Sequence, residues 1–236
     1  MGRAFEFRKE RKFRRWAAMA KTFTKIGKEI SMAVKAGGPD PNTNARLRAI
    51  IQNAKTANMP KANVDAAIKR ATDKDSGNFD EVAYEGYGSF GVAILIETAT
   101  DNTTRTVANI RSIFNKFNGT LGTQGSLDFI FERQGNFTIK NTGKINVEEL
   151  EFELIDAGLV EIEADEEEIF ISTKFADFGS MQKALEEKGF EILSAEKVRV
   201  ALSHKEVTEE QRESINKMVE KFEEDDDVQQ VFTNMA

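Results

Sequence analysis

The spacing of apolar residues changes near residue 75, and this change most limits the folds open to the chain. Upstream of it, Phe23, Ile26 and Ile30 recur at the three- and four-residue intervals of one helix face. Downstream, short apolar runs such as residues 92–97 alternate with helical stretches and with acidic or glycine-rich turns. We therefore expect an α+β protein, in which an N-terminal helical domain precedes α/β structure.

Three helices are predicted upstream of the change, over residues 16–36, 45–57 and 60–71. The run Gly37-Gly38-Pro39 ends the first of them, because glycine and proline are poor helix formers. Asparagines between residues 42 and 44 can cap the second helix, and Pro60 suits the first position of the third. The stretch 72–80 has the composition of a linker.

Downstream of residue 80 the pattern predicts two interleaved α/β domains. The expected strands are 92–97, 127–132, 137–140, 160–164, 169–173, 197–202 and 228–232, and the expected helices are 104–117, 146–158, 179–188 and one that opens with the capping box 208–211. The elements from residue 137 to 202 have the β-α-β-β-α-β order of ferredoxin-like domains. Because the segment before them lacks its second half, we expect residues 134–204 to be inserted into a domain built from 76–133 and 205–236, after a helical domain over 1–75.

Charge is strongly segregated along the chain. Residues 1–70 carry 17 Lys/Arg against 5 Asp/Glu, whereas residues 71–236 carry 16 against 35, so a segment of net charge +12 precedes one of −19. A basic segment on an acidic body predicts that the basic end binds a polyanion. On the first helix, Lys21, Lys25 and Lys28 fall opposite the apolar stripe, so one face packs and the other presents ammonium groups.

The candidate nucleic-acid contacts are therefore cations of the first 70 residues. They are Arg8, Arg11, Lys12, Arg14, Arg15, Lys21, Lys25, Lys28, Lys35, Arg46, Arg48, Lys55, Lys61, Lys69 and Arg70. Aromatic residues interleave with the cations of the N-terminal arm and are available for stacking on bases or sugars. No helix-turn-helix, zinc-finger or RNA-recognition signature is present, so the pattern indicates polyanion binding without separating DNA from RNA.

The sequence offers little to an enzyme. It has no cysteine and one histidine, His204. Thiol catalysis and metal sites made of several histidines therefore lack the residues they require. Gly86, Gly88 and Gly91 match GxGxxG, but this run precedes a strand, so we interpret it as a turn into a sheet. The glycines of residues 119–125 are interpreted as a helix-to-strand loop, and the acidic runs 165–168 and 223–227 as solvated faces. We expect no catalytic residue, cofactor, metal or small-molecule substrate.

The chain also lacks features of membrane or secreted proteins. No apolar run approaches the roughly 20 residues that cross a bilayer, and the N-terminus has no apolar signal core. Glu6 and Glu10 argue against a mitochondrial transit peptide in the arginine-rich opening. We therefore expect a cytoplasmic protein with no membrane partner.

Several stretches of the chain resemble the YebC/PmpR family, which includes the mitochondrial translational activator of cytochrome c oxidase subunit I. They are AKTANMPKANVDAAIKRAT, which ends at Thr72, YEGYG from Tyr84, TDN-x-x-RT from Thr100 and the segment from GSL to FER that ends at Arg133. The resemblance implies a helical domain plus two α/β domains and no established catalytic activity. The chain opens GRAFEFRKERKFRRW, whereas most relatives open Gly-His-Ser-Lys-Trp, so a role tied to that opening motif is in doubt here.

From the residues and the resemblance we expect a non-enzymatic regulator of gene expression that binds nucleic acid. Its target is duplex DNA, as for a transcription regulator, or ribosomal RNA, as for a translation factor or activator. A protein–protein adaptor and a nucleotide-handling enzyme are the alternatives from other classes. A candidate partner-contact loop is formed by Tyr84, Glu85, Gly86, Tyr87, Asp101, Asn102 and Arg105.

Overall fold

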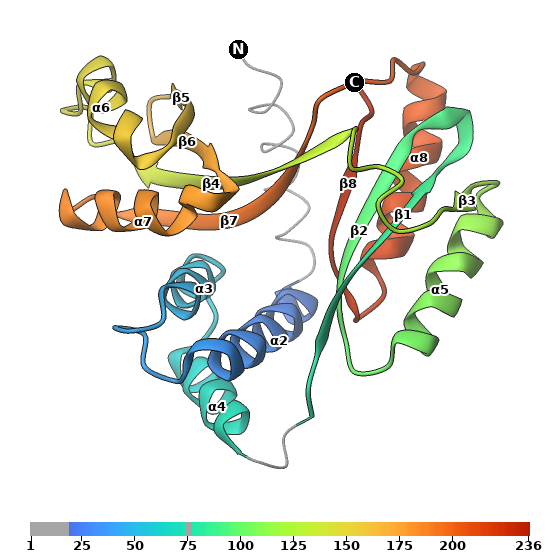
Figure 1. Cartoon of the computed structure of the whole chain (residues 1–236), viewed down its shortest axis with the longest axis horizontal. Coiled ribbons are helices and arrows are strands. Elements are labelled where there is room, and N and C mark those ends of the chain that lie inside the picture. Colours follow the sequence, from blue (N-terminus) through green and yellow to red (C-terminus); the bar gives the residue numbers. More distant parts are fainter. Residues whose placement is uncertain (1–18, 74–76) are drawn as a thin grey trace. The chain divides into compact units, whose positions relative to one another are not determined.

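The computed structural model describes residues 19–73 and 77–236, and Figure 1 shows their helices and strands. By its internal contacts the chain divides into two units, one formed by residues 1–76 and 133–198 and the other by 77–132 and 199–236. Each unit draws on two separate stretches of sequence. The α+β fold class predicted from the sequence is confirmed: helices accompany two four-stranded sheets.

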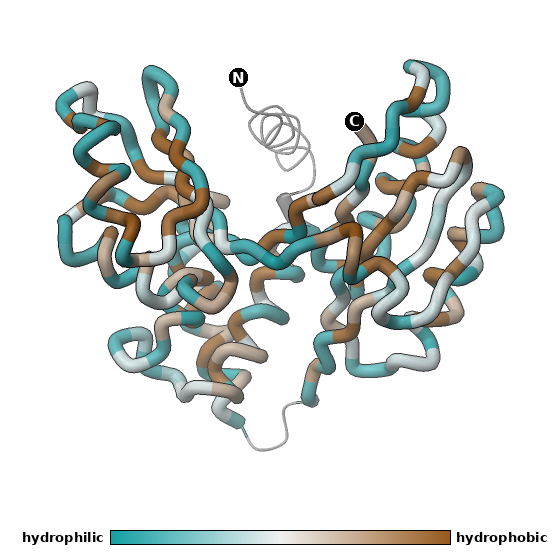
Figure 2. The backbone as a smooth tube through the Cα atoms, turned by 45° about the horizontal axis from the view of Figure 1, so that its top comes forward, coloured by the Kyte–Doolittle hydropathy of each residue, from teal (hydrophilic) through white to brown (hydrophobic). Residues whose placement is uncertain are grey.

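Three helices form the first part of the first unit: α2 (Met19–Gly37), α3 (Ala45–Thr56) and α4 (Lys61–Thr72). All three match predicted helices, although residues 16–18 lie outside the described part. Their shared core contains Ile30 and Leu47, which have no exposed surface, together with Ile26 and Val64. Hydrophobic and hydrophilic residues alternate along these helices (Figure 2), because an amphipathic helix packs only one face.

Asn44 fixes the turn between α2 and α3. Its side-chain oxygen accepts a hydrogen bond from the Leu47 N–H at 3.0 Å, which makes it the N-cap predicted for this helix. Its amide group donates to the carbonyls of Ala33 and Gly38, both at 2.8 Å. Gly38 has a φ of +85°, which glycine adopts without steric cost. One buried side chain therefore joins the end of one helix to the start of the next.

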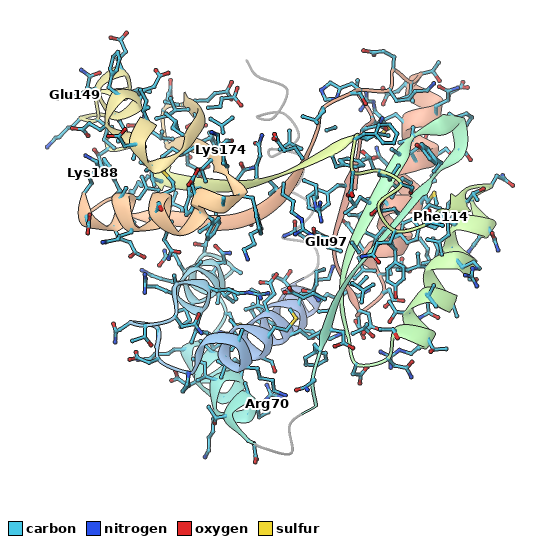
Figure 3. All side chains as sticks on the ribbon, in the orientation of Figure 1. Arg70, Glu97, Phe114, Glu149, Lys174 and Lys188 are labelled. Carbon is cyan, nitrogen blue, oxygen red and sulfur yellow. The ribbon has the colours of Figure 1, made fainter. Side chains whose placement is uncertain are left out.

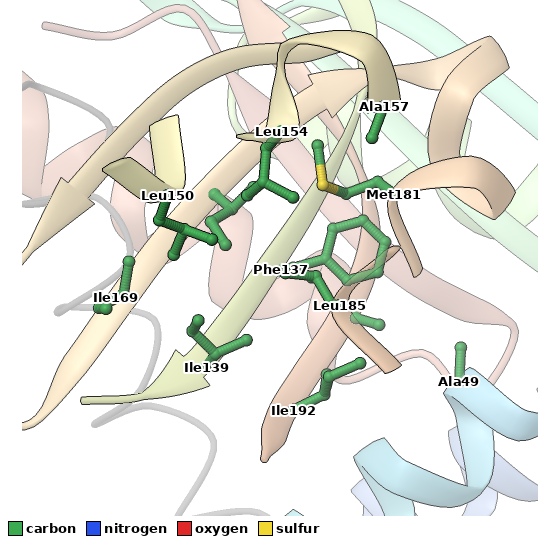
Figure 4. Packing of buried hydrophobic residues seen from close by; sticks show 12 residues of the cluster. Ala49, Phe137, Ile139, Leu150, Leu154, Ala157, Ile169, Met181, Leu185 and Ile192 are labelled. Carbon is green, nitrogen blue, oxygen red and sulfur yellow. The ribbon is translucent and has the colours of Figure 1, made fainter. Parts of the chain in front are cut away.

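The second part of the first unit is ferredoxin-like. Its elements are β4 (Phe131–Lys140), α6 (Val147–Leu154), β5 (Leu159–Ala164), β6 (Glu168–Lys174), α7 (Phe178–Glu187) and β7 (Ile192–Ala201), with short 3-10 helices η2 (Ile155–Ala157) and η3 (Phe175–Asp177). The strands are ordered β5-β6-β4-β7. Both helices pack against one face of the sheet, where Phe137 contacts a core that includes Leu150, Leu154, Met181 and Leu185 (Figure 4).

The predicted β-α-β-β-α-β order of this part is confirmed, and so is the hairpin of β5 and β6, in which Ala164 pairs with Ile169. The strands predicted before this hairpin are wrong in two details. Most of the stretch 127–132 forms turns instead of a strand. A single longer strand, β4, takes the place of the separate strands expected at 127–132 and 137–140. Leu127 and Ile130 are buried without being in a strand, so their apolar character reflects packing and not extended backbone.

Helix α3 packs against the edge strand β7 within the same unit. The Asn53 amide group donates to the Ala195 carbonyl at 2.7 Å, and the Asn53 oxygen accepts from the Ala195 N–H at 2.8 Å. Asn53 thus bonds the strand edge as a neighbouring strand would. Ala49 belongs to the ferredoxin-like core, and Thr56 donates to the Leu193 carbonyl. The helical segment and the inserted segment share these contacts, and the expected division into three domains stays a prediction.

The second unit is a sheet covered by two helices. Its elements are β1 (Asp80–Tyr87), η1 (Ser89–Gly91), β2 (Ala93–Thr100), α5 (Thr103–Lys116), β3 (Thr120–Leu121), α8 (Glu209–Glu223) and β8 (Val228–Thr233). The strand order is β3-β1-β2-β8, and Leu95 of β2 pairs with Phe232 of β8. Segments far apart in the sequence therefore complete one sheet.

The two helices of this unit share one core with the sheet. The rings of Phe114 on α5 and Phe222 on α8 are fully buried, 4.9 Å apart between centroids and tilted by 58° (Figure 3 labels Phe114). The capping box predicted at the start of α8 is confirmed: Thr208 accepts from the Gln211 N–H, and the Gln211 side chain accepts from the Thr208 N–H.

Among the described residues, no helix has the length and apolar character needed to cross a membrane.

Candidate nucleic-acid interface

The three N-terminal helices carry a net positive charge, although the chain as a whole is acidic. Between residues 19 and 72 there are 10 Lys/Arg against 3 Asp/Glu. The structure places the candidate contacts on all three helices: Lys21, Lys25, Lys28 and Lys35 on α2, Arg46, Arg48 and Lys55 on α3, and Lys61, Lys69 and Arg70 on α4. The arm candidates Arg8, Arg11, Lys12, Arg14 and Arg15 lie outside the described residues. A polyanion is the partner that this charge attracts.

The candidates differ in how far they reach into solvent. The side chains of Lys35, Lys55, Lys61, Lys69 and Arg70 are exposed, and Figure 3 labels Arg70 on α4. Lys21, Lys25 and Lys28 are half-buried and make contacts of their own, so the expected row of ammonium groups is only partly open to solvent. The predicted apolar side of α2 is confirmed, because Ile26, Ile30 and Val34 are buried.

Arg48 is a weaker candidate because its guanidinium already has partners within the fold. Its guanidinium donates to the Glu186 carboxylate at 2.8 Å and to the Pro41 carbonyl at 2.7 Å. These bonds hold the side chain against its own unit. A phosphate would have to replace them in order to bind Arg48, which removes part of the gain from binding.

The candidate partner-contact loop is a loop only in part. Residues 84–87 form the end of strand β1, so the expected loop is wrong there. Glu85 is buried, and its carboxylate accepts hydrogen bonds from the backbone N–H groups of Gly125 at 2.9 Å and Leu127 at 2.6 Å. It therefore holds the turn that follows β3. This carboxylate is occupied by contacts within the fold.

Gly86 is required by close packing in the same strand. A Cβ atom at this position would lie 2.5 Å from the Thr120 carbonyl oxygen and 2.7 Å from Cζ of Phe114. Both distances are shorter than real carbon contacts allow, so only glycine fits between β3 and α5. The YEGYG motif thus has a structural explanation at two of its positions, Glu85 and Gly86.

The TDN-x-x-RT motif forms an internal network. Asn102 caps α5 by accepting from the Arg105 N–H at 3.0 Å, as predicted. Arg105 donates to Asp227 at 2.6 Å and to Asp101 at 2.8 Å, and these bonds and charges raise the pKa of its guanidinium. The hydroxyl of Thr106 also donates to Asp227, at 2.8 Å.

Asp227 was missed by the sequence reasoning, which took the whole acidic run 223–227 as solvated. Its side chain is buried, and it also accepts from the Thr100 hydroxyl at 3.2 Å. The one available signal is its place at the end of the run, directly before the apolar strand β8. The carboxylate ties the start of β8 to the turn between β2 and α5.

Tyr84 provides a measurable report on this network. Burial, and next the negative charge of Asp227, raise the pKa of Tyr84 above its ordinary value of 10.0. The raised pKa stabilises the fold fully below pH 10, and that stabilisation is lost as pH rises through the folded pKa. Because the chain has two tyrosines, absorbance titration of a Tyr87→Phe variant isolates Tyr84. We expect Asp227→Asn to lower the Tyr84 midpoint, and an unchanged midpoint would contradict the assigned charge effect.

The described part of the chain holds no cluster of metal-ligating side chains. Within residues 19–73 and 77–236, no group of three or more His, Asp or Glu side chains could hold a metal ion. His204 is exposed in the segment between β7 and α8.

Comparisons with known proteins cover the whole chain. Residues 3–74 match the family model for the TACO1/YebC protein N-terminal domain, and residues 79–235 match that for the TACO1/YebC second and third domain. A relative from Parabacteroides distasonis is 60% identical over 235 residues, covering 100% of this chain and 97% of its own length. One from Flavobacterium johnsoniae is 59% identical, covering 100% of this chain and 99% of its own length. Both bear the name "Probable transcriptional regulatory protein".

A solved structure agrees with these matches. The crystal structure of a conserved hypothetical protein from Aquifex aeolicus superimposes with a TM-score of 0.79 at 36% sequence identity, covering 92% of this chain and 90% of that one. The identity and the coverage place both chains in one fold family. The chain therefore belongs to the TACO1/YebC family.

Proposed function

We propose that this protein is a non-catalytic regulator of gene expression that binds nucleic acid through its N-terminal helical segment. The observation that carries the proposal is the excess of cations on α2, α3 and α4, with 10 Lys/Arg against 3 Asp/Glu between residues 19 and 72. The names of the relatives support transcription regulation. DNA is the partner that we propose for this role. The cytoplasm is the compartment that suits this role.

The mechanism of binding follows from the charges. Each lysine or arginine that contacts a phosphate releases a condensed counterion, so affinity falls as salt rises. The exposed cations are spread over three helices instead of lining one recognition helix. Contacts of this kind position a protein on a phosphate backbone, and they carry no direct information about base sequence.

Ribosomal RNA is the second candidate partner, and the same distribution of charge favours it. Cations spread over several helices can contact the phosphates of a folded RNA as well as those of a DNA duplex. Neither kind of contact requires a helix that reads bases. Under this alternative the protein acts as a translation factor or activator. The acidic remainder of the chain has 16 Lys/Arg against 35 Asp/Glu, so the main electrostatic attraction to either nucleic acid comes from the basic end.

The test is a titration of the full chain with labelled duplex DNA and with ribosomal RNA fragments over a range of salt. The full chain is needed because α3 shares contacts with β7, which a fragment ending near residue 75 would lose. We expect binding that weakens as salt rises. Sequencing the nucleic acid crosslinked to the protein in cells then separates promoter DNA from ribosomal RNA. Salt-independent binding to a protein alone, with no affinity for either nucleic acid, would favour an adaptor and refute the proposal.

A further inference from the structure

Two exposed aromatic rings flank the tight turn between β1 and β2. Tyr87 is 39% exposed and Phe90 is 47% exposed. The turn itself is firmly held: the Gly88 N–H donates to the Val92 carbonyl at 2.8 Å, and the Ser89 hydroxyl donates to the Phe117 carbonyl at 2.7 Å. The rings are thus presented to solvent from a fixed backbone. We call residues 87–91 the aromatic turn.

The backbone of Phe90 is strained. Its φ is +65° and its ψ is 11°, in the left-handed region that glycine and asparagine tolerate and bulky residues rarely adopt. The other described non-glycine residues with positive φ are Asn58 and Asn118, which are ordinary there. A strained residue is usually retained because its side chain is needed. Since about half of this ring is exposed, core packing alone does not account for phenylalanine at this position.

Positive charge gathers at the same turn although the unit is acidic. Residues 77–132 and 199–236 carry 8 Lys/Arg against 17 Asp/Glu. Five of the eight cations are engaged in ion pairs, namely Arg105, Arg199, Arg212, Lys217 and Lys221. Of the remaining three, Lys116 and Lys205 lie at the aromatic turn, as the next contacts show.

Both lysines are placed by residues that touch the turn. Lys205 has its Cε 4.0 Å from the point where a Cβ on Gly91 would stand. Lys116 lies at the end of α5, with its ammonium 6.0 Å from the Phe117 ring centroid, and Phe117 accepts the hydrogen bond from Ser89. The carbonyl of Tyr87 also lies close to Gly119, just beyond the same helix end. Exposed rings and two lysines outside the five ion pairs named above therefore share one surface.

We infer that the aromatic turn, with Lys116 and Lys205, is a second nucleic-acid contact, specific for unstacked single-stranded segments. An unpaired base stacks on Phe90 while neighbouring phosphates meet the two ammonium groups, which is the combination that single-strand binders use. A duplex keeps its bases stacked and offers Phe90 nothing to stack on. An apolar protein partner would not need the cations. This inference rests on the proposed function and adds a contact outside the basic helices.

The experiment replaces the ring in ways that separate its possible roles. Phe90→Asn removes the ring and relieves the backbone strain, because asparagine tolerates a positive φ. Phe90→Gly has the same two effects and leaves no side chain. Phe90→Tyr keeps a stacking ring. Phe90→Leu keeps apolar bulk without a ring. Phe152→Asn is the matched control, because Phe152 is a 76% exposed aromatic that lies between Glu151 and Glu153 on α6. Affinity is measured for a short labelled single-stranded RNA and for a duplex of the same length.

We expect Phe90→Asn, Phe90→Gly and Phe90→Leu to bind the single strand at least about fivefold more weakly, since one base–aromatic stack contributes at least that much. Their duplex affinity should not change, and Phe90→Tyr and Phe152→Asn should bind both probes as the parent does. The melting temperature of Phe90→Asn should be equal to or above that of the parent, because strain is relieved.

Three results would overturn the inference. Parent-like single-strand affinity for Phe90→Asn and Phe90→Gly would show that the ring makes no contact. Parent-like affinity for Phe90→Leu alone would show an apolar docking site, suited to a protein. A large fall in melting temperature for both Asn and Gly variants would show that the ring serves the fold. Binding of the duplex depends on the basic helices alone. If the parent chain did not bind the duplex, the proposed function would be refuted. The comparison of single-strand affinities between the variants would still test the aromatic turn.

Discussion

Reversing Lys21, Lys25 and Lys28 to glutamate should flatten the salt dependence of nucleic-acid binding by about 2–3 units on a log–log plot. Each phosphate contact contributes about 0.9 to this slope on duplex DNA and about 0.7 on single strands. At about 0.1 M salt the loss of three contacts corresponds to an affinity on the order of 100-fold weaker. Because the contacts are to phosphates, the loss should be similar for all sequences. Fluorescence anisotropy over a salt series measures both quantities.

A matched control makes the same change in net charge at three lysines outside the helical segment. Lys144, Lys183 and Lys217 are exposed and lie outside the helical segment, so their triple reversal to glutamate should leave affinity and slope close to those of the parent. Circular dichroism should show that both triple variants stay folded. Ile30→Asp, in contrast, should unfold the helices, because Ile30 is fully buried in their core. If the Lys21/Lys25/Lys28 variant were folded and bound with an unchanged slope, these lysines would not contact phosphate, and the exposed lysines of α3 and α4 would be tested next.

The helical segment could be predicted well because its signals are local. Apolar spacing, an asparagine cap and the stop at Gly37-Gly38-Pro39 each act within a few residues, and they fix α2, α3 and α4 closely. Ferredoxin-like order could be predicted for the same reason, element by element. The packing of α3 on β7 could not, because it depends on Asn53 meeting a strand about 140 residues later. No periodicity along the chain records such a contact.

Strand β1 was missed because its sequence contains residues that are uncommon in strands. Glu85 is charged and Gly86 lacks a side chain, and both are depleted in ordinary strands. Each is explained by a contact with a distant part of the chain: Glu85 with the turn at 125–127, and Gly86 with Thr120 and Phe114. The same limit applies to the candidate site, where the partial burial of Lys21, Lys25 and Lys28 depends on neighbours that helical spacing does not reveal.

The buried carboxylate of Asp227 makes the second large prediction. Asp227→Ala should lower the free energy of unfolding of its unit by about 2–4 kcal/mol, because it removes charge-assisted hydrogen bonds from a buried carboxylate. Thr100 and Thr106 are both fully buried and would lose this acceptor, and the start of β8 would lose its link to the turn before α5. Denaturant unfolding followed by the fluorescence or circular dichroism of the full chain measures the effect.

Asp101 is the natural control, because it binds the same arginine from the surface. The Arg105–Asp101 pair is 2.8 Å long, with side chains that are 47% and 57% exposed, whereas the Asp227 side chain is 5% exposed. Exposed ion pairs contribute little, so Asp101→Ala should unfold close to the parent. Equal losses for the two variants would mean that Arg105 and not burial sets the energy. Parent-like stability for Asp227→Ala would show that the TDN-x-x-RT motif is not held by this carboxylate, and its role as a partner contact would then be the one to test. A large loss for Asp227→Ala alone shows that the motif is built to join β8 to the sheet.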